Sequence, residues 1–103
     1  MQRRAEVDRF RRPLDGERKT DVLNRLKSAR GHLDRVIAMV DGDPYVLDVL
    51  RQLAAVRGAI DATVRLGLRE YFELVFIPAV RGGLSEPAVD ELMNALAFLR
   101  EID

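Results

Sequence analysis

Apolar residues recur at helical spacing along the first part of the chain. Over residues 23–40 they lie three, four or seven positions apart, which is typical of one face of an α-helix. Thr20 can act as the N-cap by accepting a hydrogen bond from the first turn, and Asp21 favours the positive end of the helix dipole. The pattern therefore predicts a helix over about residues 20–41.

A longer helix is predicted over about residues 44–76. It follows the turn Asp43-Pro44, because aspartate caps helices and proline is favoured at the first helical position. The predicted helix is apolar on two sides. One stripe comprises Val46, Leu50, Leu53, Arg57, Ile60, Val64, Gly67, Tyr71 and Leu74, and the other comprises Tyr45, Val49, Val56, Ala59, Thr63 and Leu66. Since both sides need cover and the first helix can supply only one, the sequence predicts self-association.

Pro78 and Arg81-Gly82-Gly83 are expected to end the second helix, and a third helix is predicted over about residues 86–100. Ser85 can serve as its cap. Its apolar stripe comprises Val89, Leu92, Met93, Leu96 and Leu99. A chain of 103 residues is long enough for one domain. We therefore expect an all-α protomer of three helices, with its helical domain over residues 19–103.

The basic residues are concentrated at the start of the chain. Residues 1–30 contain ten Lys or Arg and five acids, whereas residues 31–103 contain seven and twelve. Pro13 and Gly16 interrupt any helix in this region, so residues 1–18 are expected to form a basic, mobile arm. Two interpretations remain open: an anion-binding end on a neutral body, or a solvated tail next to an ordinary charged helix face.

Several classes of function are excluded by what the sequence lacks. Without cysteine it has no disulfides and no thiolate metal sites. It also has no glycine-rich phosphate loop, and its single histidine, His32, has no evident acid partner, so neither an enzyme nor a cofactor is expected. No apolar run approaches the length of a membrane span, and the N-terminus is too charged for a secretory signal. A cytoplasmic location without membrane association is therefore expected.

Four stretches of the sequence resemble the CsoR/RcnR family of metal-responsive repressors. They are residues 23–34 (LNRLKSARGHLD), 43–50 (DPYVLDVL), 52–56 (QLAAV) and 89–92 (VDEL). The resemblance covers about residues 20–98 without gaps. It implies a three-helix protomer, an antiparallel four-helix-bundle dimer and a homotetramer that is a dimer of such dimers. It also implies double-stranded DNA as the partner.

The metal ligands that the resemblance implies are missing from this chain. The family carries a Cys after the Tyr that opens the second helix and a His-x-x-x-Cys further along it. Here those positions hold Val46, Tyr71 and Val75, which provide no thiolate or imidazole for a soft or borderline metal. We therefore expect no metal site and no metal response. Whether another effector has replaced the metal is not evident from the sequence.

Two further positions of the family's site are retained, as Tyr45 and Glu91. In the metal sensors a tyrosine and a glutamate link the metal-bound histidine to the third helix. A phenol at Tyr71 can hydrogen-bond to Glu91 and keep that link without a metal. Alternatively, Tyr71 and the two valines are simply part of an apolar core. Both interpretations remain open.

A basic surface on the first helix is the predicted DNA-binding site. The family's DNA-contacting arginine on this helix corresponds to Arg25, and Arg18 shares its face if the helix extends back that far. The candidate contacts are Arg18, Lys19, Arg25 and Lys27. A second such arginine, on the second helix, is replaced by Ala62. Arg51 and Arg57 are the candidate substitutes, but Arg57 lies in an apolar stripe, where pairing with a carboxylate at the helix interface is the favoured role. No helix-turn-helix, zinc-finger or RNA-binding pattern is present, so recognition would depend on backbone charge and DNA shape.

The expected function is therefore a DNA-binding transcriptional regulator that has lost metal sensing, with an unknown effector or none. The alternative is a helical oligomer that does not bind DNA. Such an oligomer would act as a scaffold, or would bind a small apolar molecule in the space lined by Tyr45, Val46, Tyr71, Phe72 and Val75.

Overall fold

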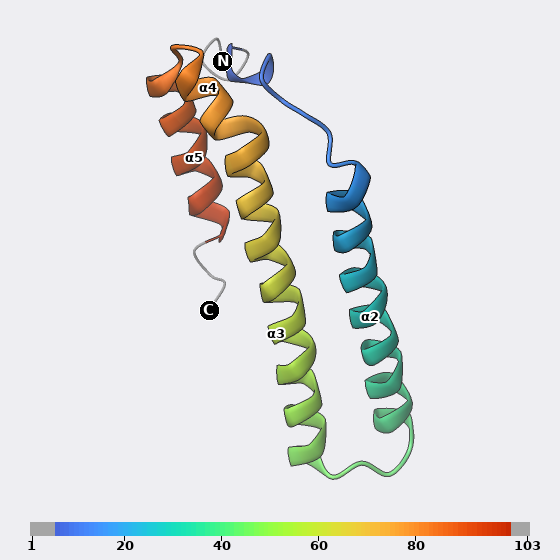
Figure 1. Cartoon of the computed structure of the whole chain (residues 1–103). Coiled ribbons are helices and arrows are strands. Elements are labelled where there is room, and N and C mark those ends of the chain that lie inside the picture. Colours follow the sequence, from blue (N-terminus) through green and yellow to red (C-terminus); the bar gives the residue numbers. More distant parts are fainter. Residues whose placement is uncertain (1–5, 100–103) are drawn as a thin grey trace. The chain divides into compact units, whose positions relative to one another are not determined.

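The computed structural model describes residues 6–99, and all regular structure in this part of the chain is helical (Figure 1). The elements are α2 (Gly16–Asp41), α3 (Val46–Tyr71), the π-helix η1 (Phe72–Phe76), α4 (Ile77–Arg81) and α5 (Ser85–Leu99). The prediction of an all-α fold is confirmed. No helix within residues 6–99 combines the length and the apolar character that crossing a membrane requires.

The described chain divides into two compact units. We call residues 15–66 the hairpin unit and residues 6–14 together with 67–99 the terminal unit. In the hairpin unit, α2 and α3 are neighbours that run in opposite directions (Figure 1). His32 on α2 donates a hydrogen bond from Nε2 to Oε1 of Gln52 on α3 over 2.7 Å, which ties the two helices together.

Helix α2 begins four residues before the predicted cap, Thr20. Gly16 takes a positive φ of 59°, a conformation open to glycine, and this turns the chain so that Lys19 N–H reaches the carbonyl of Asp15. Thr20 therefore lies inside the helix, where its hydroxyl donates to the Gly16 carbonyl over 3.1 Å. At the other end of the turn that follows α2, the carbonyl of Tyr45 accepts the first amide hydrogen bonds of α3.

The helical path continues past the predicted end of the second helix because Pro78 changes the type of helix and does not end it. Proline has no N–H, and within an α-helix its ring would clash with the carbonyl four residues earlier, here that of Leu74. The chain responds with the π-helix η1, in which Ile77 N–H bonds to the carbonyl of Phe72. The wider turn relieves the clash, and α4 follows directly.

Helix α4 ends in a Schellman motif. Gly83 N–H bonds to the Val80 carbonyl over 3.1 Å, and Leu84 N–H bonds to the Ala79 carbonyl over 2.9 Å. The motif requires a left-handed residue, and Gly83 supplies it with a φ of 86°. The chain then enters α5, which lies against α4 and η1.

The core of the terminal unit is built from residues far apart in the sequence. Val7, Val75, Ala79 and Ala88 form its buried cluster. Partly buried side chains surround that cluster, namely Phe10, Tyr71, Leu74, Phe76 and Leu84. Residues 6–8 are helical and are followed by a turn, so part of the predicted arm contributes to this core. Whether residues 1–18 move in solution stays a prediction.

The first testable prediction concerns the Schellman motif. Gly83→Ala should lower the free energy of unfolding by about 1–2 kcal/mol, because an L-residue is strained in the left-handed region. Thermal unfolding at fixed protein concentration, followed by circular dichroism, measures this. As a control, Gly67→Ala places its Cβ in open space within α3 and should be neutral or slightly stabilising. Equal effects of the two substitutions would contradict the assignment.

Candidate sensing site and basic surface

A short hydrogen bond links the end of α3 to α5. Tyr71, the last residue of α3, donates from its hydroxyl to Oε1 of Glu91 over 2.6 Å. Hydrogen bonds from a hydroxyl to a carboxylate are among the stronger ones in proteins, and this length is typical of them. The Tyr71 ring also packs edge to face against Phe72, with ring centroids 6.1 Å apart. Of the two interpretations of Tyr71, the one with a hydrogen bond to Glu91 therefore matches the structure.

The environment of Tyr71 keeps its phenol protonated. Burial raises the pKa of this hydroxyl well above its ordinary value of 10.0, and the hydrogen bond to Glu91 and the charge of that carboxylate raise it further. A phenol ligates a metal best as the phenolate. Since Tyr71 keeps its proton and uses it in the hydrogen bond to Glu91, it is poorly suited as a metal ligand.

Val75 lies four residues after Tyr71 and belongs to the apolar core. Only 8% of this residue is exposed, and it packs in one cluster with Val7, Ala79 and Ala88. Its side chain has no lone pair to offer a metal. We call Tyr71, Val75 and Glu91 the sensing region. It combines an apolar core residue with one polar pair, Tyr71 and Glu91.

Tyr45 and Val46 lie at the opposite end of α3 from Tyr71. Val46 is the first residue of this 26-residue helix and Tyr71 is the last. At roughly 1.5 Å per residue, such a helix is about 39 Å long. Tyr45 and Val46 are 63% and 66% exposed. The five predicted residues therefore fall into two groups: Tyr71, Val75 and Glu91 lie in the terminal unit, and Tyr45 and Val46 lie in the hairpin unit, where Val46 is the first residue of α3.

These residues do not fit a metal ion of the kind that cysteine and histidine bind. Two of the three ligand positions are valines, and the third is a phenol that is already engaged. Within residues 6–99, no three histidine, cysteine, aspartate or glutamate side chains are grouped in a way that could hold a metal.

Two of the predicted DNA contacts share a face of α2. Arg18 and Arg25 are seven residues apart, which is nearly two full helical turns. Arg25 Nε also lies 3.3 Å from Oδ1 of Asp21, in a pair whose side chains are about half exposed. An exposed pair at this spacing contributes about 0.3–0.5 kcal/mol, so a phosphate can draw the guanidinium away at little cost.

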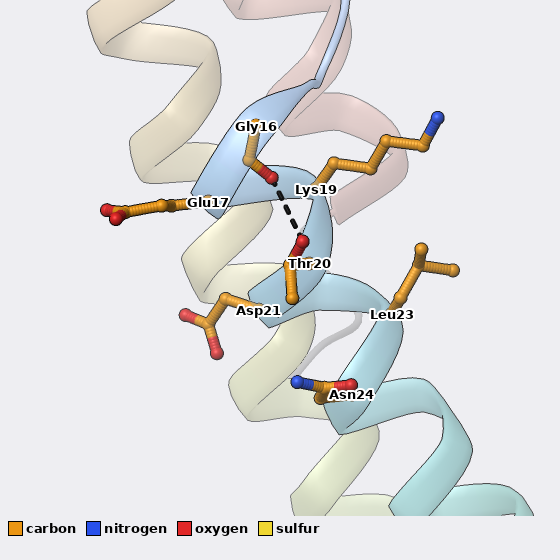
Figure 2. Close-up of a pocket in the computed structure, with 7 residues that line it drawn as sticks. All are labelled: Gly16, Glu17, Lys19, Thr20, Asp21, Leu23 and Asn24. Atoms are coloured by element: carbon orange, nitrogen blue, oxygen red, sulfur yellow. Dashed lines mark hydrogen bonds between the residues drawn. The ribbon is translucent and has the colours of Figure 1, made fainter.

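The other two candidates point elsewhere. Lys27 is two residues after Arg25, which corresponds to about 200° around the helix, so it lies on the far side of α2. Lys19 lies in the first turns of α2, beside a surface hollow lined by residues of this helix alone. Figure 2 shows its side chain extending away from the carboxylates of Glu17 and Asp21. The four candidates therefore do not form a single cluster within one chain.

The position of the second DNA-contacting arginine offers no charge. Ala62 is partly buried on α3. Of the two proposed substitutes on α3, Arg57 is exposed, and Arg51 is exposed but donates to Asp48 over 3.1 Å. Whether either residue meets DNA stays a prediction.

Comparison with known proteins bears on these residues. Residues 18–97 match a family profile described as "Metal-sensitive transcriptional repressor". The chain is 43% identical over 82 residues to the copper-sensing transcriptional repressor CsoR of Mycobacterium ulcerans, which covers 80% of this chain and 70% of that protein. The protein of the same name from Mycobacterium tuberculosis H37Rv is 38% identical over 81 residues, covering 79% and 68%. That of Bacillus subtilis is 30% identical over 76 residues, covering 74% and 75%. No solved structure matches the chain.

The hydrogen bond of Tyr71 makes a testable prediction about pH. Tyr45→Phe leaves Tyr71 as the only tyrosine, so its pKa can be followed through phenolate absorbance. In this background the pKa should lie above 10.0, and Glu91→Gln should lower it by removing the carboxylate charge. Burial remains, so the pKa should stay above its ordinary value. Because the folded chain holds this proton more tightly than the unfolded chain, stability should fall as the pH rises above about 10.

Glu86→Gln is the matched control, because it removes an exposed carboxylate from the first turn of the same helix. It should leave the pKa of Tyr71 unchanged. An unchanged pKa in Glu91→Gln as well would contradict the coupling between the two side chains.

Proposed function

This chain belongs to the CsoR family of metal-sensitive transcriptional repressors, and we propose that it is a DNA-binding repressor that acts without the family's metal response. The family consists of repressors and not of enzymes, which confirms the prediction that the chain is not an enzyme. The proposal includes three finer parts: independence of metals, assembly into a homotetramer, and DNA contacts on α2.

The observation that carries the proposal is the hydrogen bond between Tyr71 and Glu91. It joins the end of α3 to α5 by atoms of the chain itself. In the family, the resemblance implies that a metal-bound histidine at the position of Tyr71 makes this connection. A bond that forms without a metal supports a repressor whose connection between α3 and α5 does not depend on the metal supply.

The chemistry of the neighbouring positions supports the same conclusion. Val46 and Val75 have no donor atoms, and the proton of Tyr71 is held by burial and by Glu91. Copper, nickel, cobalt and zinc would all need ligands that this chain does not supply at these positions. The relatives named as copper sensors are therefore a guide to its scaffold and not to its signal.

The exposed apolar surface of the hairpin unit supports self-assembly. Large apolar side chains are exposed along both helices, including Leu23, Leu33, Ile37, Leu47, Leu50, Leu53 and Ile60. A hairpin of two helices buries too little of such a surface to be stable alone. An antiparallel dimer would cover it. It would also bring the start of α3 in one protomer towards the end of α3 in its partner, so that Val46 could approach Tyr71 and Val75.

DNA binding would follow from repeating the basic faces in such an assembly. Affinity for a duplex comes chiefly from Lys and Arg near phosphates, and four copies of Arg18 and Arg25 would multiply these contacts. The two arginines share one face of α2, which favours them over Lys27 as contacts to the same stretch of backbone. Lys19 and Lys27 would contact phosphates only where the assembly turns their side of the helix towards DNA.

The DNA contacts are tested with Arg25→Ala. Its dissociation constant for DNA from the region upstream of its own gene should rise at least about tenfold. The slope of log Kd against log salt should fall by about one for each phosphate that the variant no longer binds. The matched control is Arg35→Ala, which removes an equal charge from the solvent-exposed surface of α2, ten residues on.

Fluorescence anisotropy at several salt concentrations measures the affinity, and sedimentation checks that assembly is unchanged. Equal reductions of affinity in Arg25→Ala and Arg35→Ala would mean that the DNA-binding face is placed wrongly. Wild-type protein with no salt-dependent binding to any fragment would favour the alternative, a scaffold that does not bind DNA.

Metal independence is tested on the wild-type protein. Competition with a Cu(I) chelator should detect no stoichiometric copper, and added Cu(I), Ni(II), Co(II) or Zn(II) should leave the affinity for DNA unchanged. The copper-sensing repressor of Mycobacterium tuberculosis is the positive control. A stoichiometric metal that weakens DNA binding of this chain would overturn this part of the proposal.

A further inference from the structure

Val7 lies in the centre of the terminal unit, although it precedes the first long helix. It is fully buried, in one cluster with Val75, Ala79 and Ala88. The two alanines, from α4 and α5, have small side chains, and Val7 packs in one buried cluster with them. An aliphatic side chain from the N-terminal segment thus packs in the same core as Val75.

Phe10 is a second anchor of the same segment. It follows Val7 by three residues, and its N–H bonds to the Val7 carbonyl over 2.9 Å, so both side chains lie on one side of a helical turn. The Phe10 ring lies against Gly82. A Cβ at position 82 would stand 2.8 Å from Cε1 of that ring and nearer still to Cζ, so the contact depends on glycine.

The other side of this segment is charged and faces outward. Arg9 places its guanidinium 5.1 Å from the centroid of the Phe10 ring, and Arg11 lies 4.0 Å from Asp8. Arg9 and Arg11 are exposed, whereas Val7 is not. The segment is therefore an amphipathic turn whose apolar side is seated in the terminal unit.

We propose that residues 6–10 are the built-in occupant of the sensing region, in place of an exchangeable effector. The inference rests on the proposed function, because it identifies what occupies the region that no longer binds metal. Tyr71 packs against the cluster that contains Val7. Val7 thereby supports the turn that carries the hydrogen bond to Glu91. The occupant is thus an amphipathic helical turn that presents an aliphatic residue, Val7, and an aromatic residue, Phe10, three positions apart.

The closing experiment compares full-length Val7→Asp with Leu14→Asp. Both place a carboxylate before α2, but Leu14 lies outside residues 6–10 and is already 37% exposed. Trypsin cleaves after Arg9 and Arg11, and seating of the segment protects both bonds. Cleavage at these sites should be at least about tenfold faster in Val7→Asp, which is the lower end of the range that burial of one aliphatic side chain corresponds to. It should be unchanged in Leu14→Asp.

Gly82→Ala removes the seat of Phe10 without adding charge to the core. This variant replaces Val7→Asp in the experiment if circular dichroism shows that Val7→Asp has lost its helices. Gly82→Ala should also accelerate cleavage at Arg9. In both variants the affinity for DNA should weaken about tenfold, within the range of couplings between distinct sites.

The outcomes separate the two proposals. Cleavage rates equal to wild type in Val7→Asp and Gly82→Ala would overturn the inference and leave the repressor function standing. Faster cleavage with unchanged affinity for DNA would also overturn it, because the segment would then have no effect on the sensing region. If the variants are cleaved faster but neither they nor the wild-type protein bind DNA, the proposed function is overturned. The packing of residues 6–10 in the terminal unit would still stand.

Discussion

Pro78 imposes the constraint from which the geometry of the terminal unit follows. Because its nitrogen carries no hydrogen and its ring needs space, the helical path widens into η1 one turn earlier. The widened turn continues into the short helix α4, which Gly83 ends with a left-handed residue. The chain then returns along α5, and Glu91 meets Tyr71. A straight α-helix through this region would carry the chain onward without the wide turn.

A hydrogen bond within the chain differs from a metal bond in what controls it. A metal stabilises the state that binds it by a free energy that grows with the logarithm of the free metal concentration, so its supply can act as a signal. The bond between Tyr71 and Glu91 lies within one chain, so its strength does not depend on the concentration of a free ligand. Burial raises the pKa of Tyr71, so the phenol keeps its proton through the neutral range. A connection of this kind is suited to a repressor that stays in one state unless another part of the chain changes.

The sequence predicted those features that depend on local patterns. Periodic apolar residues predicted the long helices, and the family resemblance suggested the pairing of Tyr71 with Glu91 as one of two interpretations. The start of α2 was predicted wrongly, because Thr20 has the chemistry of a cap while Gly16 allows the helix to begin earlier. Pro78 indicated the end of the second helix, but in the structure the helix widens there and continues. Whether a helix ends or widens at a proline depends on what the following turns pack against, and a local sequence pattern does not show this. The role of Val7 was missed, because two apolar residues three apart among arginines are too weak a pattern to indicate a core.

The burial of Val7 bears on why an apolar effector would have difficulty acting on this protein. A molecule that enters the region around Val75 has to displace a side chain covalently attached to the same chain. That side chain is present at the high effective concentration of an intramolecular contact. Phe10 adds a second anchor, so displacing the turn means breaking two contacts together. A free ligand would therefore need either high affinity or a site that leaves Val7 in place, and the simplest signal would be one that acts on residues 6–10 themselves.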